Sequence, residues 1–243
     1  PKLTGLHALL VEDNPINQDV ASHMLTNLGC SYTVVDNGSK ALAKWQNEKF
    51  ALILMDCYMP IMDSYAATRA IREIEAEPSS GAARRTPIIA LTANAMAGDR
   101  EKCLAAGMDD HLAKPFTREA LSTMLQRWSQ KAAAPTKLSP AKAVAKNSDH
   151  QFLDQKILDS LRELDAMSAS PGFFNKLVNL YLETAPKYLD QMRAAIAAKD
   201  CETLKVVAHS LKGASANLGA MKLADDCQAL ELSGRDESLE GVV

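Results

Sequence analysis

The run Leu52-Ile53-Leu54-Met55-Asp56 consists of four apolar residues followed at once by an acid. Four similar short apolar runs lie at residues 8–11, 32–35, 88–91 and 111–113, and segments with helical periodicity separate all five. Strands that alternate with helices predict a parallel sheet with crossover connections, here a doubly wound five-stranded α/β domain. Ligands bind such sheets beyond the carboxyl ends of the strands, so we expect chemistry where each run ends.

Helix signals and a change of composition divide the rest of the chain. Asn14 with Pro15, and Thr117 ahead of residues 118–128, are typical of helix starts. Residues 129–149 are rich in Ala, Pro, Lys and Ser, which is typical of a flexible linker. Only helical periodicity follows, at residues 153–164, 173–198, 202–218 and 221–232. We therefore expect an α/β domain over residues 1–128, a linker over 129–149 and an all-α, four-helix-bundle-type domain over 150–243.

Bulk composition excludes several classes of protein. The chain is 47% hydrophobic and 23% charged, with a net charge of −3 and a pI near 6.0. This gives no footprint for nucleic acid or for direct membrane contact, and no apolar run approaches the roughly 20 residues of a membrane span. The five scattered cysteines favour a reducing, cytoplasmic location. Because both ends look cut, we expect a piece of a longer protein, such as the cytoplasmic part of a membrane-anchored one.

Polar residues end the predicted strands. These are Glu12 and Asp13, Asp56, Thr92 and Lys114. Any one of them alone is more often a turn or cap residue, but their occurrence in order, each at its own strand, favours a shared site. Three neighbouring carboxylates need a hard cation such as Mg²⁺. With a lysine charge and a hydroxyl donor nearby, the set predicts a carboxylate nucleophile for phosphoryl transfer.

Four motifs contain these residues: Val11-Glu12-Asp13-Asn14-Pro15-Ile16-Asn17, Leu54-Met55-Asp56-Cys57-Tyr58-Met59-Pro60, Ala90-Leu91-Thr92-Ala93-Asn94-Ala95 and Lys114-Pro115-Phe116. Together they resemble a response-regulator receiver domain over residues 3–128, and the Asn-Pro-Ile-Asn run resembles the receivers of hybrid sensor kinases. The resemblance implies that Asp56 is phosphorylated and that Thr92 and Lys114 contact the phosphoryl group. It also implies a Mg²⁺ site formed by Glu12, Asp13, Asp56 and the carbonyl of Tyr58, and a cis Lys114-Pro115 bond.

Two positions depart from the receiver pattern. Ser64 stands where the family usually has glycine, which puts the loop conformation after Asp56 in question because glycine tolerates positive φ. His111 stands at the switch position where the family has Tyr or Phe, which puts aromatic coupling to Thr92 in question. We also expect Lys114 to lie toward solvent and to contribute little to stability.

A second candidate site lies in the helical part. Apolar residues form one stripe from Leu204 to Leu218, and His209 lies off this stripe, in a sector with Lys205, Lys212 and two small residues. By spacing alone this is more often a plain surface histidine. However, the string Ala208-His209-Ser210-Leu211-Lys212-Gly213-Ala214-Ser215-Ala216-Asn217-Leu218-Gly219-Ala220 resembles the active helix of a histidine phosphotransfer (HPt) domain. The resemblance implies that His209 carries the phosphoryl group, that Lys212 assists, and that a last family helix is missing.

The combined prediction is the receiver and HPt part of a hybrid sensor histidine kinase. Phosphoryl groups would pass from an upstream histidine kinase core to Asp56, then to His209, then to a separate response regulator. Within one chain, His209 would approach Asp56 over the helix that starts at Asn14, where Ile16 and Asn17 are available. The chain would be a phosphotransferase, with the ATP-dependent kinase core elsewhere.

Two other functions compete with this prediction. The receiver could act mainly as a docking or autoinhibitory module that phosphorylation switches. A metal-dependent phosphatase is disfavoured, because Tyr58 stands two residues after Asp56 where a general-acid carboxylate would be needed.

Overall fold

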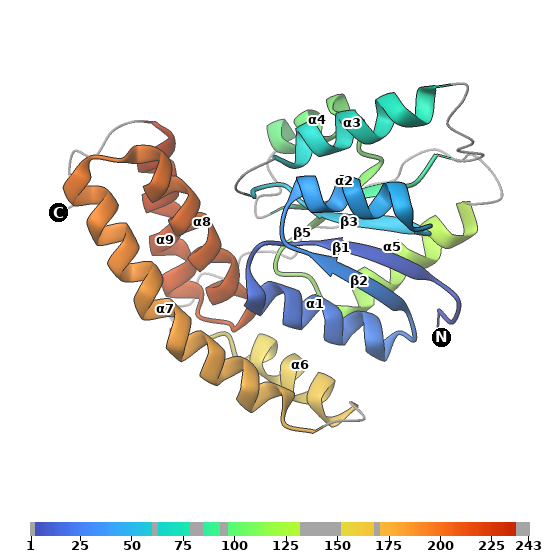
Figure 1. The fold of residues 1–243 in the computed structure, drawn as a ribbon. Coiled ribbons are helices and arrows are strands. Elements are labelled where there is room, and N and C mark those ends of the chain that lie inside the picture. The colour runs from blue at the N-terminus through green and yellow to red at the C-terminus, as the bar shows by residue number, and fades with distance from the viewer. Residues whose placement is uncertain are drawn as a thin grey trace. The chain divides into compact units, whose positions relative to one another are not determined.

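The computed structural model describes residues 3–59, 63–77, 85–92, 97–131, 152–167 and 171–236. The chain divides into two compact units, residues 1–147 and residues 148–243, and each is described by itself (Figure 1).

The first unit is built on a five-stranded sheet. Every pair of neighbouring strands is parallel, and the spatial order is β2-β1-β3-β4-β5. The predicted doubly wound sheet is therefore confirmed, and each strand lies within one residue of its predicted run. The strands are β1 (His7–Val11), β2 (Ser31–Val35), β3 (Leu52–Asp56), β4 (Ile88–Thr92) and β5 (Asp110–Ala113).

Helices cover both faces of this sheet, which is why β3 and β4 are buried at every position and apolar up to their polar last residues, Asp56 and Thr92. In Figure 1, α1 and α5 lie on one face, and α2, α3 and α4 lie on the other. The helices are α1 (Pro15–Asn27), α2 (Gly38–Asn47), α3 (Ser64–Ala76), α4 (Ala97–Ala105) and α5 (Arg118–Lys131). Both predicted helix starts are confirmed, since Asn14 caps α1 and the Thr117 hydroxyl accepts the Ala120 N–H at 3.2 Å.

The strand order places a topological switch point between β1 and β3. The chain proceeds from β1 outward to β2, and from β3 outward to β4, so the crossovers at β1 and β3 diverge. Ligands bind parallel sheets at such a switch point, beyond the carboxyl ends of the strands. Glu12 and Asp13 directly follow β1, and Asp56 is the last residue of β3. The topology therefore brings the acidic residues of two sequence segments to this point.

Ser64 begins α3, and its backbone has no positive φ. Asp63 caps the helix, and the buried Ser64 hydroxyl donates to the carbonyl oxygen of Cys57 at 2.9 Å. A serine is thus compatible with this helix start, and its hydroxyl ties α3 to the residue that follows Asp56. The residues between them, 60–62, lie outside the described part.

The second unit is all-helical in its described residues, as predicted. Gly234 of α9 approaches the start of α8 so closely that a Cβ atom would lie 2.7 Å from the Cys201 carbonyl oxygen. Figure 1 shows α8 and α9 side by side along the C-terminal half of α7, and α6 beside its N-terminal half. The helices are α6 (Gln155–Ala166), α7 (Phe173–Ala198), α8 (Cys201–Asn217) and α9 (Met221–Arg235).

The predicted boundary between the first domain and the linker can be compared with the structure only up to residue 131. Helix α5 continues to Lys131, three residues beyond the predicted end of the first domain, and most of the predicted linker lies outside the described residues. In the described residues, no helix combines the length and the apolar character needed to cross a bilayer.

Candidate functional site

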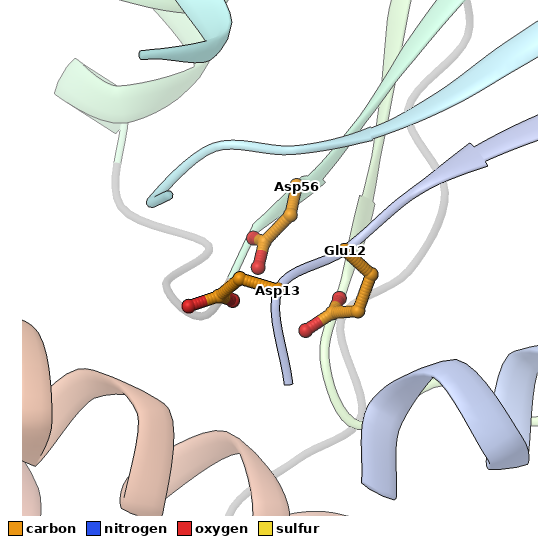
Figure 2. Close-up of side chains that lie close together, drawn as sticks. All are labelled: Glu12, Asp13 and Asp56. Carbon is orange, nitrogen blue, oxygen red and sulfur yellow. The ribbon is translucent and has the colours of Figure 1, made fainter. Parts of the chain in front are cut away.

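Three carboxylates converge at the carboxyl ends of β1 and β3. One carboxylate oxygen from each of Glu12, Asp13 and Asp56 lies within 4.8 Å of the other two. Figure 2 shows their side chains, from the two strand ends, lying around one small region. Like charges at this distance repel, so the cluster needs a compensating cation.

Lys114 supplies part of that compensation from the residue after β5. Its Nζ lies 2.6 Å from Oε2 of Glu12 and 3.0 Å from Oδ2 of Asp56. Burial opposes the charge on Lys114, but the two carboxylates outweigh it and raise the pKa of the ammonium group. The side chain is only 4% exposed, so the expectation that Lys114 lies toward solvent is wrong. The expected cis bond to Pro115 is present.

Lys114 does not neutralise the whole cluster. Burial, followed by the charge of Asp56, raises the pKa of the Glu12 carboxyl to about 8 although Lys114 acts in the opposite direction. Lys114 pairs with Glu12 and Asp56, and Asp13 adds a third carboxylate to the cluster, so the arrangement keeps a demand for further positive charge. Hard oxygen ligands in a compact cluster fit Mg²⁺, which prefers carboxylates, carbonyls and water.

Thr92 and Tyr58 border the same region. Thr92 is the last residue of β4, and its buried Oγ1 has no hydrogen-bond partner among the residues that the structure describes. A buried hydroxyl without a partner is costly, so it is suited to meet a polar group that arrives with a substrate. The Tyr58 N–H lies 3.5 Å from Oδ1 of Asp56, which places that backbone beside the acid.

Two amide side chains of α1 contact Glu12, one at its carboxylate and one at its main-chain carbonyl, and the sequence predicted neither contact. Asn17 Nδ2 donates to Glu12 Oε1 at 2.7 Å, and Gln18 Nε2 donates to the Glu12 carbonyl at 2.6 Å. The sequence predicts that Asn17 is available on a docking surface, but its side chain faces the acid cluster instead. The Asn-Pro-Ile-Asn run contained the residue, although nothing in the sequence indicated its direction.

His111, at the expected switch position, lies on β5 with 28% of its side chain exposed. Burial lowers the pKa of its imidazole, partly offset by Asp110. Residues 93–96, which follow Thr92, are outside the described part. The effect of His111 on coupling between the switch position and Thr92 therefore stays a prediction.

The second unit contains a separate cluster around His209. Oε1 of Glu231 lies 2.9 Å from Nδ1 of His209, and its Oε2 accepts a hydrogen bond from Nζ of Lys212. Burial raises the pKa of the Glu231 carboxyl, but His209 and Lys212 together lower it below its ordinary value. Glu231 is therefore a carboxylate that joins the two predicted residues. The sequence showed it only as one acid between two leucines of α9.

Each of the two units contains a match to a known protein family. Residues 8–126 match the model of the family described as the response regulator receiver domain, and residues 176–242 match that of the Hpt domain. The chain therefore belongs to the receiver family in its first unit and to the Hpt family in its second, and this is a phosphorelay combination of domains.

The relatives are sensor kinases that are much longer. The chain is 32% identical over 223 residues to the sensor histidine kinase GacS of Pseudomonas protegens, covering 92% of this chain and 24% of that protein. It is 28% identical over 242 residues to the signal transduction histidine-protein kinase BarA of Shigella flexneri, covering 97% of this chain and 25% of that protein. The chain thus spans about a quarter of the length of these relatives.

A solved structure also resembles the first unit. It is the receiver domain of sensor histidine kinase PA1611 from Pseudomonas aeruginosa, with a magnesium ion coordinated in its active site cleft. The identity is 52%, the match covers 52% of this chain and 98% of that one, and the TM-score is 0.46.

Proposed function

We propose that this chain performs two phosphoryl transfers, from an upstream phosphohistidine to Asp56 and from phospho-Asp56 to His209. The single observation that carries this proposal is the arrangement at β3, where Asp56 lies against Lys114 and two further carboxylates. A separate response regulator would then receive the group from His209. The relay belongs to the cytoplasmic part of a hybrid kinase, whose ATP-dependent core supplies the first phosphohistidine.

In the first transfer, an oxygen of Asp56 attacks phosphorus while the N–P bond of the donor breaks. An acyl phosphate forms and the donor histidine keeps its electron pair. Nζ of Lys114, 3.0 Å from Oδ2 of Asp56, can donate to one phosphoryl oxygen. The Thr92 hydroxyl, which has no partner among the described residues, can donate to another. Such catalysis is mainly positioning and neutralisation of charge.

Glu12, Asp13, Asp56 and the backbone carbonyl of Tyr58 would hold Mg²⁺. When bound, this ion supplies the positive charge that lets a phosphate approach three carboxylates. Its fit rests on the three acids that Figure 2 shows together. One carboxylate oxygen from each acid lies within 4.8 Å of the other two.

In the second transfer, Nε2 of His209 attacks phosphorus and the acyl phosphate bond to Asp56 breaks. The Glu231 carboxylate accepts the Nδ1 proton in a hydrogen bond, so the lone pair is at Nε2 and the positive charge that develops on the ring has a partner. Lys212, held by the same carboxylate, provides a cation beside the incoming phosphoryl group.

The order of transfer can be tested with a phosphorylated histidine kinase core as donor. When Mg²⁺ is present, the parent chain should acquire a base-labile label at Asp56 and a base-stable label at His209. Neither label should survive acid. Without Mg²⁺, neither site should be labelled. His209→Gln should keep the label at Asp56, whereas Asp56→Asn should lose both labels. Label on His209 in Asp56→Asn, or labelling in excess chelator, contradicts the proposal.

The second candidate, a receiver that serves mainly for docking or autoinhibition, predicts a different result. Asp56 would be labelled, but His209 would stay unlabelled in the parent chain. The Glu231 carboxylate that joins His209 to Lys212 favours the relay, because a purely regulatory receiver has no use for that cluster.

A further inference from the structure

Two neighbouring amides of α1 contact the same acid at different atoms. Asn17 donates to the side chain of Glu12, at Oε1 and 2.7 Å, while Gln18 donates to the main-chain carbonyl of Glu12, at 2.6 Å. The two contacts are similar in length and come from adjacent positions of one helix. Of these two amide contacts, only the one from Asn17 acts on the carboxylate and therefore affects its direction.

Asn17 completes a continuous chain of polar contacts to the phosphate-accepting residue. Glu12 Oε1 accepts from Asn17, Glu12 Oε2 accepts from Lys114, and Lys114 reaches Oδ2 of Asp56 at 3.0 Å. Both oxygens of Glu12 therefore have a donor, one neutral and one charged. The neutral donor offsets repulsion from the neighbouring acids without taking up any of the charge of Lys114.

Loss of the Asn17 amide would change this balance. Glu12 would keep one strong partner, Lys114, and repulsion from Asp56 and Asp13 would favour its rotation away from the cluster. A glutamate has three side-chain torsions, so an unheld carboxylate is costly to order when a ligand arrives. Residues that orient metal ligands contribute through this preorganisation.

We propose that Asn17 is a positioning residue of the acid cluster, which holds the Glu12 carboxylate for cation binding and lets Lys114 bridge Glu12 and Asp56. This inference rests on the proposed function of the first unit and assigns a further residue to it. The competing explanation is that the Asn17 side chain only ties α1 to the residue after β1, and so contributes to stability without affecting cation binding.

The test is a titration of the full chain with Mg²⁺ alone, without any phosphoryl donor. Calorimetry measures the Mg²⁺ affinity. Asn17→Ala should weaken Mg²⁺ binding about tenfold or more, as expected when an orienting partner of a metal ligand is removed. The matched control is Gln18→Ala, which should stay within about twofold of the parent because it removes a neighbouring contact to the main chain only. If Asn17→Ala does not fold by circular dichroism, Asn17→Leu removes the donor while keeping the volume.

A double-mutant cycle with Glu12→Gln shows whether Asn17 acts through Glu12. Asn17→Ala should have little further effect on Mg²⁺ affinity in the Glu12→Gln background, because the two residues act as one unit. Equal losses in both backgrounds, or equal affinities of Asn17→Ala and the parent, overturn the inference. Failure of the parent chain itself to bind Mg²⁺ or to accept label at Asp56 would instead contradict the proposed function.

Discussion

Oε1 of Glu231 lies 2.9 Å from Nδ1 of His209, so α9 supplies a carboxylate to the imidazole that α8 carries. Glu231→Ala should slow phosphoryl transfer to His209 about tenfold or more, since a hydrogen bond to a charged group contributes about 1.5–3 kcal/mol. Glu231→Gln should lose less, because its amide oxygen still accepts. Rates of transfer from a phosphorylated receiver measure this, and ¹⁵N NMR reports the tautomer of His209.

The control for this prediction is Glu202→Ala, which removes an exposed acid paired with Lys205 in the first turn of α8. It should transfer at the parent rate. Parent-like transfer by Glu231→Ala would show that the carboxylate does not take part.

Binding of Mg²⁺ should strengthen as pH rises toward about 8. Burial, and then the charge of Asp56, raises the pKa of Glu12 to about 8, so below that pH a proton competes with the cation for this carboxylate. The apparent Kd should fall between pH 6.5 and pH 8 and level off above, by at most about tenfold per pH unit. Calorimetric titrations at several pH values measure it. In Glu12→Gln this dependence should flatten, and a parent Kd that rises with pH would contradict the assignment.

Removing the charge of Lys114 should destabilise the metal-free chain. Lys114→Met leaves two buried carboxylates without their shared partner, so the melting temperature of the first unit should fall by about 5 °C or more at neutral pH. Added Mg²⁺ should restore part of the loss. Calorimetry can compare it with Lys40→Met, whose pair with Asp36 is exposed and should matter little. An unchanged melting temperature for Lys114→Met would mean that solvent already compensates the acids.

Ser64→Ala should lower the free energy of unfolding by about 1 kcal/mol, because the buried carbonyl oxygen of Cys57 loses the hydroxyl that donates to it. Ser64→Gly should lower it further, through the poor helix propensity of glycine. Urea unfolding measures both changes. Ser122→Ala, on α5, removes a hydroxyl that accepts a hydrogen bond from the Gln126 side chain, and serves as the comparison. Greater stability of Ser64→Gly would show that the position favours glycine after all.

Transfer from Asp56 to His209 should occur within one molecule. Both acceptors lie on one chain, and joining two partners in one chain can give effective concentrations near the millimolar range. Transfer in the parent chain should then be independent of concentration. A mixture of Asp56→Asn and His209→Gln chains should slow on dilution. Equal slowing of the parent chain would show that His209 serves another molecule.

The sequence by itself determined the strands, the sheet class and the acids at the strand ends. Apolar runs of strand length alternate with helical periodicity, and each polar residue at the end of a run is visible as a break in hydrophobicity. Because parallel strands share one carboxyl edge, the sequence alone predicts that Glu12, Asp13 and Asp56 lie together. The sequence likewise predicts the helix starts at Asn14 and Thr117, since capping depends on neighbours only a few residues away.

The tertiary structure alone decided the partners of those residues. Glu231 is 22 positions from His209, and Lys114 is 102 positions from Glu12, so no local pattern specifies either contact. The direction of the Asn17 side chain depends on how α1 packs on the sheet, and the burial of Lys114 depends on the assembled strand ends. Sequence periodicity indicates which face of an element is apolar, but polar pairing between elements is fixed only when packing brings their side chains within hydrogen-bonding distance.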